Sequence, residues 1–248
     1  PTSIMSQLLH PYKSIGVLVT RPEPGLSETL VAVQKAGWQA YASPALEISA
    51  HILPPLAKPP TALVLTSSQA IACACGMVAK NLPVFAVGAR TAQRAQAAGF
   101  TQVYSANGNA ADLQALLARM VVPEQERLLL LSGAGQGVSL AAQLQALGFT
   151  VTRQVAYAAR PVAQIEPAIV QQLRAGSIGY SLFFSAQSAK AWVQALPPDV
   201  LPFAAQTTAL VLSGATADIV RAAGWQQVHV AVQPNATALL ALLGTSPA

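Results

Sequence analysis

The chain has 248 residues, of which 53% are hydrophobic and only 9% are charged. This composition resembles that of a membrane protein, but no apolar run in the sequence approaches the roughly 20 residues that a membrane-spanning helix needs. Fourteen Lys and Arg against nine Asp and Glu give a net charge of +5. The basic residues are scattered and lack interleaved aromatic residues, which disfavours a nucleic-acid groove and favours a small polyanionic ligand.

The opening segment, PTSIMSQLLHPYKS, lacks the basic region and the long apolar region of a signal peptide. We therefore expect a cytoplasmic protein. Cys73 and Cys75 lie two residues apart in a helix-like, Ala-rich stretch, so they should point to different faces. With no second cysteine pair and three scattered histidines, we expect free thiols and no metal site.

Apolar runs alternate along the chain with Ala-, Leu- and Gln-rich stretches of helical period, which predicts an α/β fold with mainly parallel sheets. Helices are clearest at 25–37, with Ser27 as N-cap and Gly37 as its end, and at 139–148 and 236–244. The predicted strands are 15–20, 61–68, 83–88, 127–133, 179–186, 207–214 and 226–232.

The sequence contains an internal repeat. Residues 88–103 align without a gap to residues 213–228, pairing Thr91 with Thr216 and Gly99 with Gly224. Other predicted strands and helices match in the same way, which indicates an old duplication and two α/β lobes. The lobes could be sequential or nested. Extended segments near 43–51 and 153–162 favour the nested form, because that form needs two crossings between lobes.

Small and hydroxyl-bearing residues follow several predicted strands. In parallel α/β sheets ligands bind at this edge, where helix N-termini expose backbone N–H groups. Any single hydroxyl at such a turn is usually only an N-cap, but five loops of this kind at equivalent strand ends favour a binding role, and they would face one cleft if the lobes opposed each other. No loop has the dinucleotide or Walker pattern, which disfavours NAD and ATP. The loops are 66–70, 87–91, 131–137, 184–188 and 213–216.

Groups for classical catalysis are scarce. The nine acidic residues form no evident acid/base pair, the three histidines are isolated, and no nucleophile elbow is present. Arg21 follows the first strand and could bind a carboxylate or simply lie on the surface. Tyr157 lies in the second crossing and could be either a phenolic donor in the cleft or a buried packing residue between the lobes.

Short motifs in a fixed order carry a resemblance to a known family. The chain resembles uroporphyrinogen-III synthases over residues 15–243, nearly its whole length. Each motif is weak alone, and the ordered set together with the repeat is specific. The motifs are VLVTRP at 17–22, LTSSQAI at 65–71, AVGARTA at 86–92, LLSGAG at 130–135, VAYAARP at 155–161, FFSAQSA at 183–189 and SGATA at 213–217.

The resemblance implies two flavodoxin-like, parallel-sheet lobes joined by a two-stranded β-ladder, with the active site in the cleft between them. It places one lobe at 15–42 plus 162–248, the other at 48–154, and the ladder at 43–47 and 155–161. The implied reaction closes hydroxymethylbilane, a linear tetrapyrrole with eight carboxylates, to uroporphyrinogen III without a cofactor. Loss of the terminal hydroxyl gives an azafulvene, and a spiro intermediate then allows ring D to be inverted.

Carried over residue by residue, the resemblance makes Tyr157 the catalytic tyrosine that assists departure of the hydroxyl. Three features depart from the family pattern: Ala186 replaces a common Pro, Ser213 replaces a Gly, and the 132–139 loop has no basic residue. We expect Arg90 to supply that missing charge. The implied substrate-binding residues are Arg21, Thr66, Ser67, Gly88, Thr91, Ser185, Ala186, Gly214 and Thr216.

Two rival functions remain open at this point. One is a two-lobed protein that binds a small polyanion without chemistry, and the other is a nucleotide-dependent enzyme. For the synthase, the expected partner is hydroxymethylbilane, either free or handed over by the enzyme that makes it. We expect a monomer that binds neither nucleic acid nor membrane.

Overall fold

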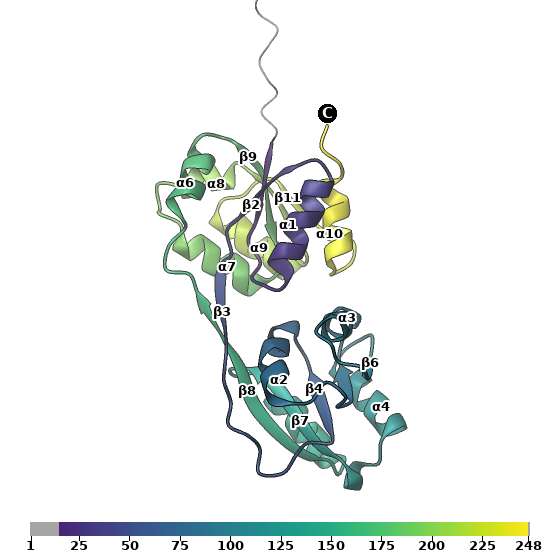
Figure 1. Ribbon diagram of the computed structural model, residues 1–248. Helices are drawn as coiled ribbons and strands as arrows, with labels where there is room; N and C mark the ends of the chain where they lie inside the picture. Colours follow the sequence, from purple (N-terminus) through teal and green to yellow (C-terminus); the bar gives the residue numbers. More distant parts are fainter. Residues whose placement is uncertain (1–14, 248) are drawn as a thin grey trace, which may run out of the picture. The chain divides into compact units, whose positions relative to one another are not determined.

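The structure is a computed structural model that describes residues 15–247 (Figure 1). The opening segment used above to judge a signal peptide lies outside the described residues. These residues form two compact units. The first unit contains the residues up to Glu47 and from Pro161 onward, and the second unit is Ile48–Arg160.

The first unit is built on a five-stranded parallel sheet in the order β11-β10-β9-β1-β2. Its strands are β1 (Gly16–Val19), β2 (Gln39–Ala42), β9 (Ile178–Phe183), β10 (Thr208–Val211) and β11 (Val228–Val230). Its helices are α1 (Gly25–Lys35), α6 (Pro167–Arg174), α7 (Ala186–Ala195), α8 (Leu201–Ala205), α9 (Gly214–Ala223) and α10 (Ala236–Leu243).

The second unit is built on a six-stranded sheet in the order β3-β8-β7-β4-β5-β6. Its strands are β3 (Leu46–Ala50), β4 (Ala62–Leu65), β5 (Val84–Ala86), β6 (Val103–Ser105), β7 (Arg127–Gly133) and β8 (Thr150–Pro161). Its helices are α2 (Ile71–Met77), α3 (Ala89–Ala97), α4 (Ala110–Met120) and α5 (Val138–Ala146), with short 3₁₀ turns η1 (Ser68–Ala70) and η2 (Pro123–Gln125).

Two strands lie where the chain divides into units. β3 pairs with the long β8, and the chain divides within both of them. The His51 N–H donates to the Ala156 carbonyl over 2.8 Å, and the Val162 N–H donates to the Ala45 carbonyl over 3.0 Å. Because residue numbers rise along one strand as they fall along the other, this pair is antiparallel, unlike the other pairs of the sheet.

The central strands form because continuous apolar runs can be buried on both faces of a parallel sheet. β1, β4 and the Leu128–Leu131 run of β7 are buried at every position. In the first unit, α1 and α10 cover one face (Figure 1). Leu26, Leu239 and Val17 belong to one buried apolar cluster on this face. On the other face Phe183 contacts Trp192 of α7 and Trp225 after α9, with ring centroids 5.9 and 5.8 Å apart.

The second unit repeats this layering. α2 and α3 pack on one face of its sheet, and α4 and α5 pack on the other. The local sequence also fixes the start of α4, because the Asn109 side chain accepts from the Asp112 N–H and the Asp112 carboxylate accepts from the Asn109 N–H.

The repeat in the sequence reappears as matching topology. The order β2-β1-β9-β10-β11 in one unit corresponds to β8-β7-β4-β5-β6 in the other. A glycine with positive φ follows each of α3 and α9, with φ of +102° at Gly99 and +120° at Gly224, conformations that favour glycine. The next residues, Phe100 and Trp225, are both buried. Because β1 and β2 share a sheet with β9, β10 and β11, the duplicated halves interleave along the chain.

Most of the predicted elements are confirmed, with three corrections. Each predicted apolar run contains a strand. The edge strands β2 and β6 are missing from the prediction, because neither contains a fully buried residue and so neither reads as an apolar run. Ser27 is not the N-cap of α1: the helix begins at Gly25 with Pro24 before it, and the Ser27 hydroxyl bonds to Glu23 instead.

Within residues 15–247, no helix is long and apolar enough to cross a bilayer. Both cysteines are free thiols, as predicted. Cys73 is buried in the α2 face of the second unit, while Cys75 is exposed and its sulfur accepts from Lys80 Nζ over 2.8 Å. Burial raises the pKa of the Cys73 thiol.

This difference predicts selective alkylation. Because the thiolate is the reactive form, iodoacetamide at pH 8 should modify exposed Cys75 well before Cys73, whose raised pKa and burial both slow the reaction. Peptide mass spectrometry at successive times measures the two rates. In urea both cysteines should react alike. Equal rates in the folded protein would contradict the placement of Cys73 in the core.

Candidate active site

The loops that follow β4 and β5 carry the predicted residues of the second unit. Thr66 and Ser67 are half-buried directly after β4. The Ser67 hydroxyl caps the next turn by accepting from the Gln69 N–H over 3.2 Å. Gly88 is the N-cap of α3 and provides no side chain, and a Cβ added there would meet no atom within 4 Å. The N–H groups that begin α3 are therefore uncovered at Gly88, which suits an anion.

Thr91 brings these two loops together. It is buried in the first turn of α3, and its Oγ1 lies 3.2 Å from the hydroxyl of Ser68. Arg94, one turn further along α3, donates from NH1 to the same Ser68 hydroxyl over 3.0 Å. A guanidinium and two hydroxyls thus meet at the start of α3. Ser68 and Arg94 were not among the predicted site residues, although the spacing of Thr91 and Arg94 puts them on one helix face.

The matching loops of the first unit follow β9 and β10. Ser185 caps α7 by accepting from the Ser188 N–H over 3.0 Å, and Ala186 is the first residue of that helix. Ser213 caps α9 by accepting from the Thr216 N–H over 3.2 Å, and its hydroxyl lies 3.0 Å from Thr216 Oγ1. At Gly214 an added Cβ again meets no atom within 4 Å. Both loops therefore present capped helix N-termini.

The two units differ in charge at this edge. In the repeat, Ile219 of α9 stands where α3 has Arg94, and Ala215 stands where α3 has Arg90. The basic residue that the first unit places after a strand is Arg21, which follows β1. Its guanidinium lies 4.1 Å over the Phe184 ring and donates to Thr29 Oγ1 over 3.2 Å. Gly25 makes room for it, since a Cβ there would lie 2.2 Å from Arg21 Cζ.

Tyr157 lies on β8 in the second unit and is only 3% exposed. Its ring packs on Gly133 of β7, where an added Cβ would lie 2.8 Å from the phenolic oxygen. The hydroxyl donates to the side-chain oxygen of Gln136 over 3.1 Å. Tyr157 is therefore a buried packing residue of its own unit whose hydroxyl donates to another residue of that unit.

The basic residue at the loop after β7 comes from the neighbouring strand. Arg153 of β8 donates from NH1 to the Gln136 carbonyl over 3.0 Å, and the Ser132 hydroxyl donates to the same carbonyl over 2.9 Å. Arg90, expected to supply this charge, lies on α3 and donates to Gln93. The prediction missed Arg153, because only the pairing of β7 with β8 brings it to the loop.

The order in which the chain connects the strands places these loops where parallel sheets bind ligands. From β1 the chain crosses to β2 on one side, and from β9 it crosses to β10 on the other, so the helices after β1 and β9 lie on opposite faces. The same switch occurs between β7 and β4. Ligands bind at the carboxyl ends of strands at such switch points. Arg21 and Ser185 flank one switch point, and Gln136 and Ser67 flank the other.

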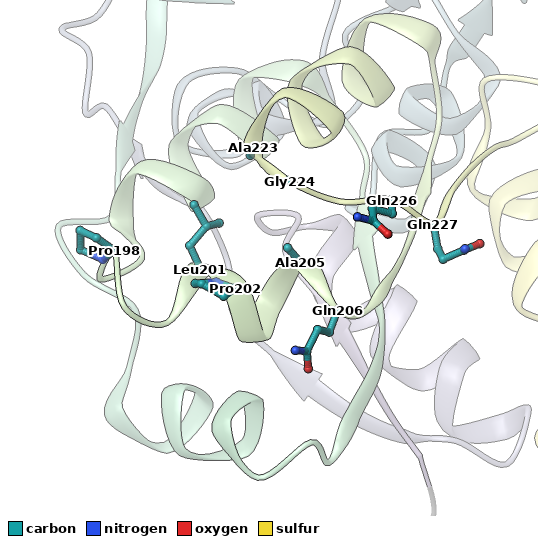
Figure 2. Close-up of a pocket in the computed structure, with 9 residues that line it drawn as sticks. All are labelled: Pro198, Leu201, Pro202, Ala205, Gln206, Ala223, Gly224, Gln226 and Gln227. Carbon is teal, nitrogen blue, oxygen red and sulfur yellow. The ribbon is translucent and has the colours of Figure 1, made fainter.

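A separate hollow of about 610 Å³ lies in the first unit (Figure 2). It is lined by Pro198, Leu201, Pro202, Ala205, Gln206, Ala223, Gly224, Gln226 and Gln227. Gln206 and Gln227 lie just before β10 and β11, so this hollow is at the amino ends of the strands, opposite the loops described above. None of the predicted site residues lines it. No cluster of three metal-ligating side chains occurs in residues 15–247.

Two solved structures illustrate what this chain is similar to, and the first of them supports the fold. The crystal structure of uroporphyrinogen-III synthetase from Helicobacter pylori 26695 is similar with a TM-score of 0.60 at 18% identity, covering 92% of this chain and 98% of that one. A mutant uroporphyrinogen III synthase from the extremely thermophilic bacterium Thermus thermophilus matches at 16% identity with a TM-score of 0.48, covering 93% and 98%. No curated protein sequence matches significantly.

The family comparison covers most of the chain. The model of the family described as uroporphyrinogen-III synthase HemD matches residues 27–241, a span that includes Tyr157 and the loops after β4, β5, β7, β9 and β10. The chain belongs to the uroporphyrinogen-III synthase family.

Proposed function

We propose that this chain closes hydroxymethylbilane to uroporphyrinogen III through loops that hold the substrate's carboxylates and through Tyr157, which assists departure of the terminal hydroxyl. The observation that carries the proposal is the double set of helix N-termini at the carboxyl ends of parallel strands, within a chain of this family. The reaction is a cyclising loss of water, and it calls for positioning more than for an acid/base pair.

The first step is recognition of a polyanion. α3, α7 and α9 begin with uncovered glycines or with serine caps, and helix N-termini favour carboxylates through their N–H groups. Arg94 in the second unit and Arg21 in the first add full charges at the same edges. The Phe184 ring and Thr29 hold the Arg21 side chain in place, so less side-chain entropy is lost when it binds a carboxylate.

The second step is departure of the hydroxyl. The proton of the Tyr157 phenol passes to the leaving oxygen, the bond from the methylene carbon to that oxygen breaks, and water is released. The pyrrole nitrogen loses a proton as the neutral azafulvene forms, which balances the proton that Tyr157 gives. Attack at the substituted carbon of ring D, fragmentation and reclosure then need conformational control, since the unaided substrate closes to isomer I.

We also propose that the chain acts in the cytoplasm as a monomer and takes hydroxymethylbilane from the enzyme that makes it. Light scattering at micromolar concentration tests the monomer. A faster overall rate when both enzymes are present, compared with added free substrate, tests the handover.

The threonines at the starts of α3 and α9 provide a matched test of binding. Thr91→Val and Thr216→Val keep the shape of the side chain but remove a hydroxyl that joins Ser68 or Ser213. Each should lower kcat/KM for hydroxymethylbilane about fivefold, since a lost hydrogen bond is worth about 1 kcal/mol.

Thr152→Val, at an exposed position of β8, is the control and should leave kcat/KM unchanged. The rate is followed as the enzyme-dependent consumption of hydroxymethylbilane above its spontaneous closure. If the unmodified, folded chain did not accelerate the consumption of hydroxymethylbilane, the proposed function would be wrong. If Thr91→Val, Thr216→Val and Thr152→Val had the same kcat/KM, the two threonines would have no role in binding.

A further inference from the structure

The hydroxyl of Tyr157 is tied to an exposed side chain. Tyr157 is 3% exposed, whereas Gln136, whose side-chain oxygen accepts the phenolic hydrogen bond over 3.1 Å, is exposed in the loop after β7. A phenol held in this way keeps its proton directed at one oxygen. An oxygen of a substrate that is to receive the proton must therefore take the place of the Gln136 carboxamide oxygen.

The backbone of this loop is held independently of that side chain. Gly135 and Gly137 have φ of +72° and +76°, so the chain turns sharply on both sides of Gln136. The Gln136 carbonyl accepts from Arg153 NH1 and from the Ser132 hydroxyl. A charged donor makes the stronger of such bonds. The side chain of Gln136 can therefore move while its backbone stays in place.

The register of β7 and β8 places these groups together. Arg153 pairs with Leu130 and Tyr157 pairs with Gly133, so both side chains come from one strand at the end where the loop begins. The register shifts between Ser132 and Gly133, which adjusts the strand just where the Tyr157 ring packs. Arg153, Gln136 and Tyr157 thus form one connected chain of contacts.

We propose that Arg153 and Gln136 are positioning residues for Tyr157: Arg153 fixes the backbone of the 134–137 loop, and the Gln136 side chain holds the phenolic proton until the leaving hydroxyl of the bilane replaces it. This inference rests on the proposed role of Tyr157. It identifies Arg153 of β8 as a basic residue that contacts this loop.

A double-mutant cycle with Tyr157→Phe tests the inference. Arg153→Met should lower kcat about tenfold and change KM less than twofold, because without the Gln136 oxygen in place the phenolic O–H is no longer oriented toward the position that the leaving oxygen takes. Arg153→Lys, which keeps a donor, should recover most of the activity. In the Tyr157→Phe background, Arg153→Met should have less than a twofold further effect, since the group through which it acts is gone.

Arg127→Met is the matched control. Arg127 lies in the same unit and also donates to a backbone carbonyl, that of Pro59, over 2.9 Å. The substitution removes the same charge and should leave kcat unchanged. If Arg127→Met reproduced the Arg153→Met effect, the cause would be net charge, and the positioning role would be wrong.

A second variant keeps the test informative if Arg153→Met unfolds. Gln136→Glu changes an exposed side chain, and its carboxylate should hold the phenolic proton more strongly than the amide does. We expect kcat to fall about tenfold in this variant and to stay unchanged in exposed Gln145→Glu. The Gln136→Glu effect should also vanish in the Tyr157→Phe background.

The outcomes separate the two proposals. An unchanged kcat in Tyr157→Phe would remove the role of Tyr157 itself. If Tyr157→Phe is slow and Arg153→Met or Gln136→Glu still lowers kcat a further tenfold in that background, the role of Tyr157 stands and the positioning role is wrong.

Discussion

Replacing Tyr157 with phenylalanine is expected to lower kcat for hydroxymethylbilane on the order of 100-fold, the usual lower range for loss of a general acid. The substitution removes the proton that assists departure of the hydroxyl and leaves the ring packed on Gly133. The fold should persist, because the one lost contact is the hydrogen bond to Gln136, worth about 1 kcal/mol. Single-turnover consumption of substrate measures the chemical step directly.

Tyr104→Phe provides the control for this prediction. Tyr104 belongs to the same unit, on β6, where its ring stacks on Phe85 at 5.3 Å. Its loss of a hydroxyl should leave kcat unchanged. If Tyr157→Phe and Tyr104→Phe were equally active, the phenol of Tyr157 would have no part in the chemistry, and its burial would be its whole role.

Replacing Trp225 with alanine is expected to lower the free energy of unfolding by about 3 to 5 kcal/mol, the range for deleting a large buried aromatic residue. Trp225 is buried after α9 and packs edge-on against Phe183. Its indole N–H donates to Thr207 Oγ1 over 3.1 Å, and Thr207 Oγ1 lies 2.8 Å from the Ser181 hydroxyl. The substitution therefore leaves a cavity and removes one partner from a buried polar group.

Urea unfolding followed by circular dichroism measures the loss. Trp225→Phe should cost less than Trp225→Ala, since it matches Phe100 at the equivalent position of the repeat and loses only part of the volume and the hydrogen bond. Phe203→Ala, at a residue that is 36% exposed, should cost less, about 1 to 2 kcal/mol. A Trp225→Ala loss as small as the Phe203→Ala loss would show that this face of the sheet is not part of the core.

Much of the fold can be predicted from the sequence, because its central strands are short runs buried on both faces. β7 is predicted over the same residues that the structure gives it, and α5 and α10 are predicted within a residue or two. The edge strands β2 and β6 escape prediction, since they pair on one side only and carry no continuous apolar run, whereas the edge strand β11 is predicted from the alternating valines of its segment. Ser27 shows a further limit. A serine can be an N-cap only if it directly precedes the first helical residue, and α1 already begins at Gly25.

The candidate site likewise contains some features that the sequence predicts and others that it does not. Ser67, Ser185 and Ser213 are local features, in which a hydroxyl bonds to an N–H two or three residues later, and the sequence pattern is enough to find them as helix caps. Arg94 meets Ser68, and Arg153 meets Gln136, across separations of 26 and 17 residues. Those contacts depend on sheet order and strand register, which no local pattern encodes.

The measurement that tests the central claim most directly is the isomer composition of the product. Hydroxymethylbilane is generated freshly by the enzyme that makes it, the purified chain is added, and the products are oxidised and separated by chromatography. The family assignment and the site described above predict isomer III as the main product, with isomer I alone in the absence of the chain. Isomer I alone in the presence of correctly folded chain would contradict the account and would favour a two-lobed binding protein.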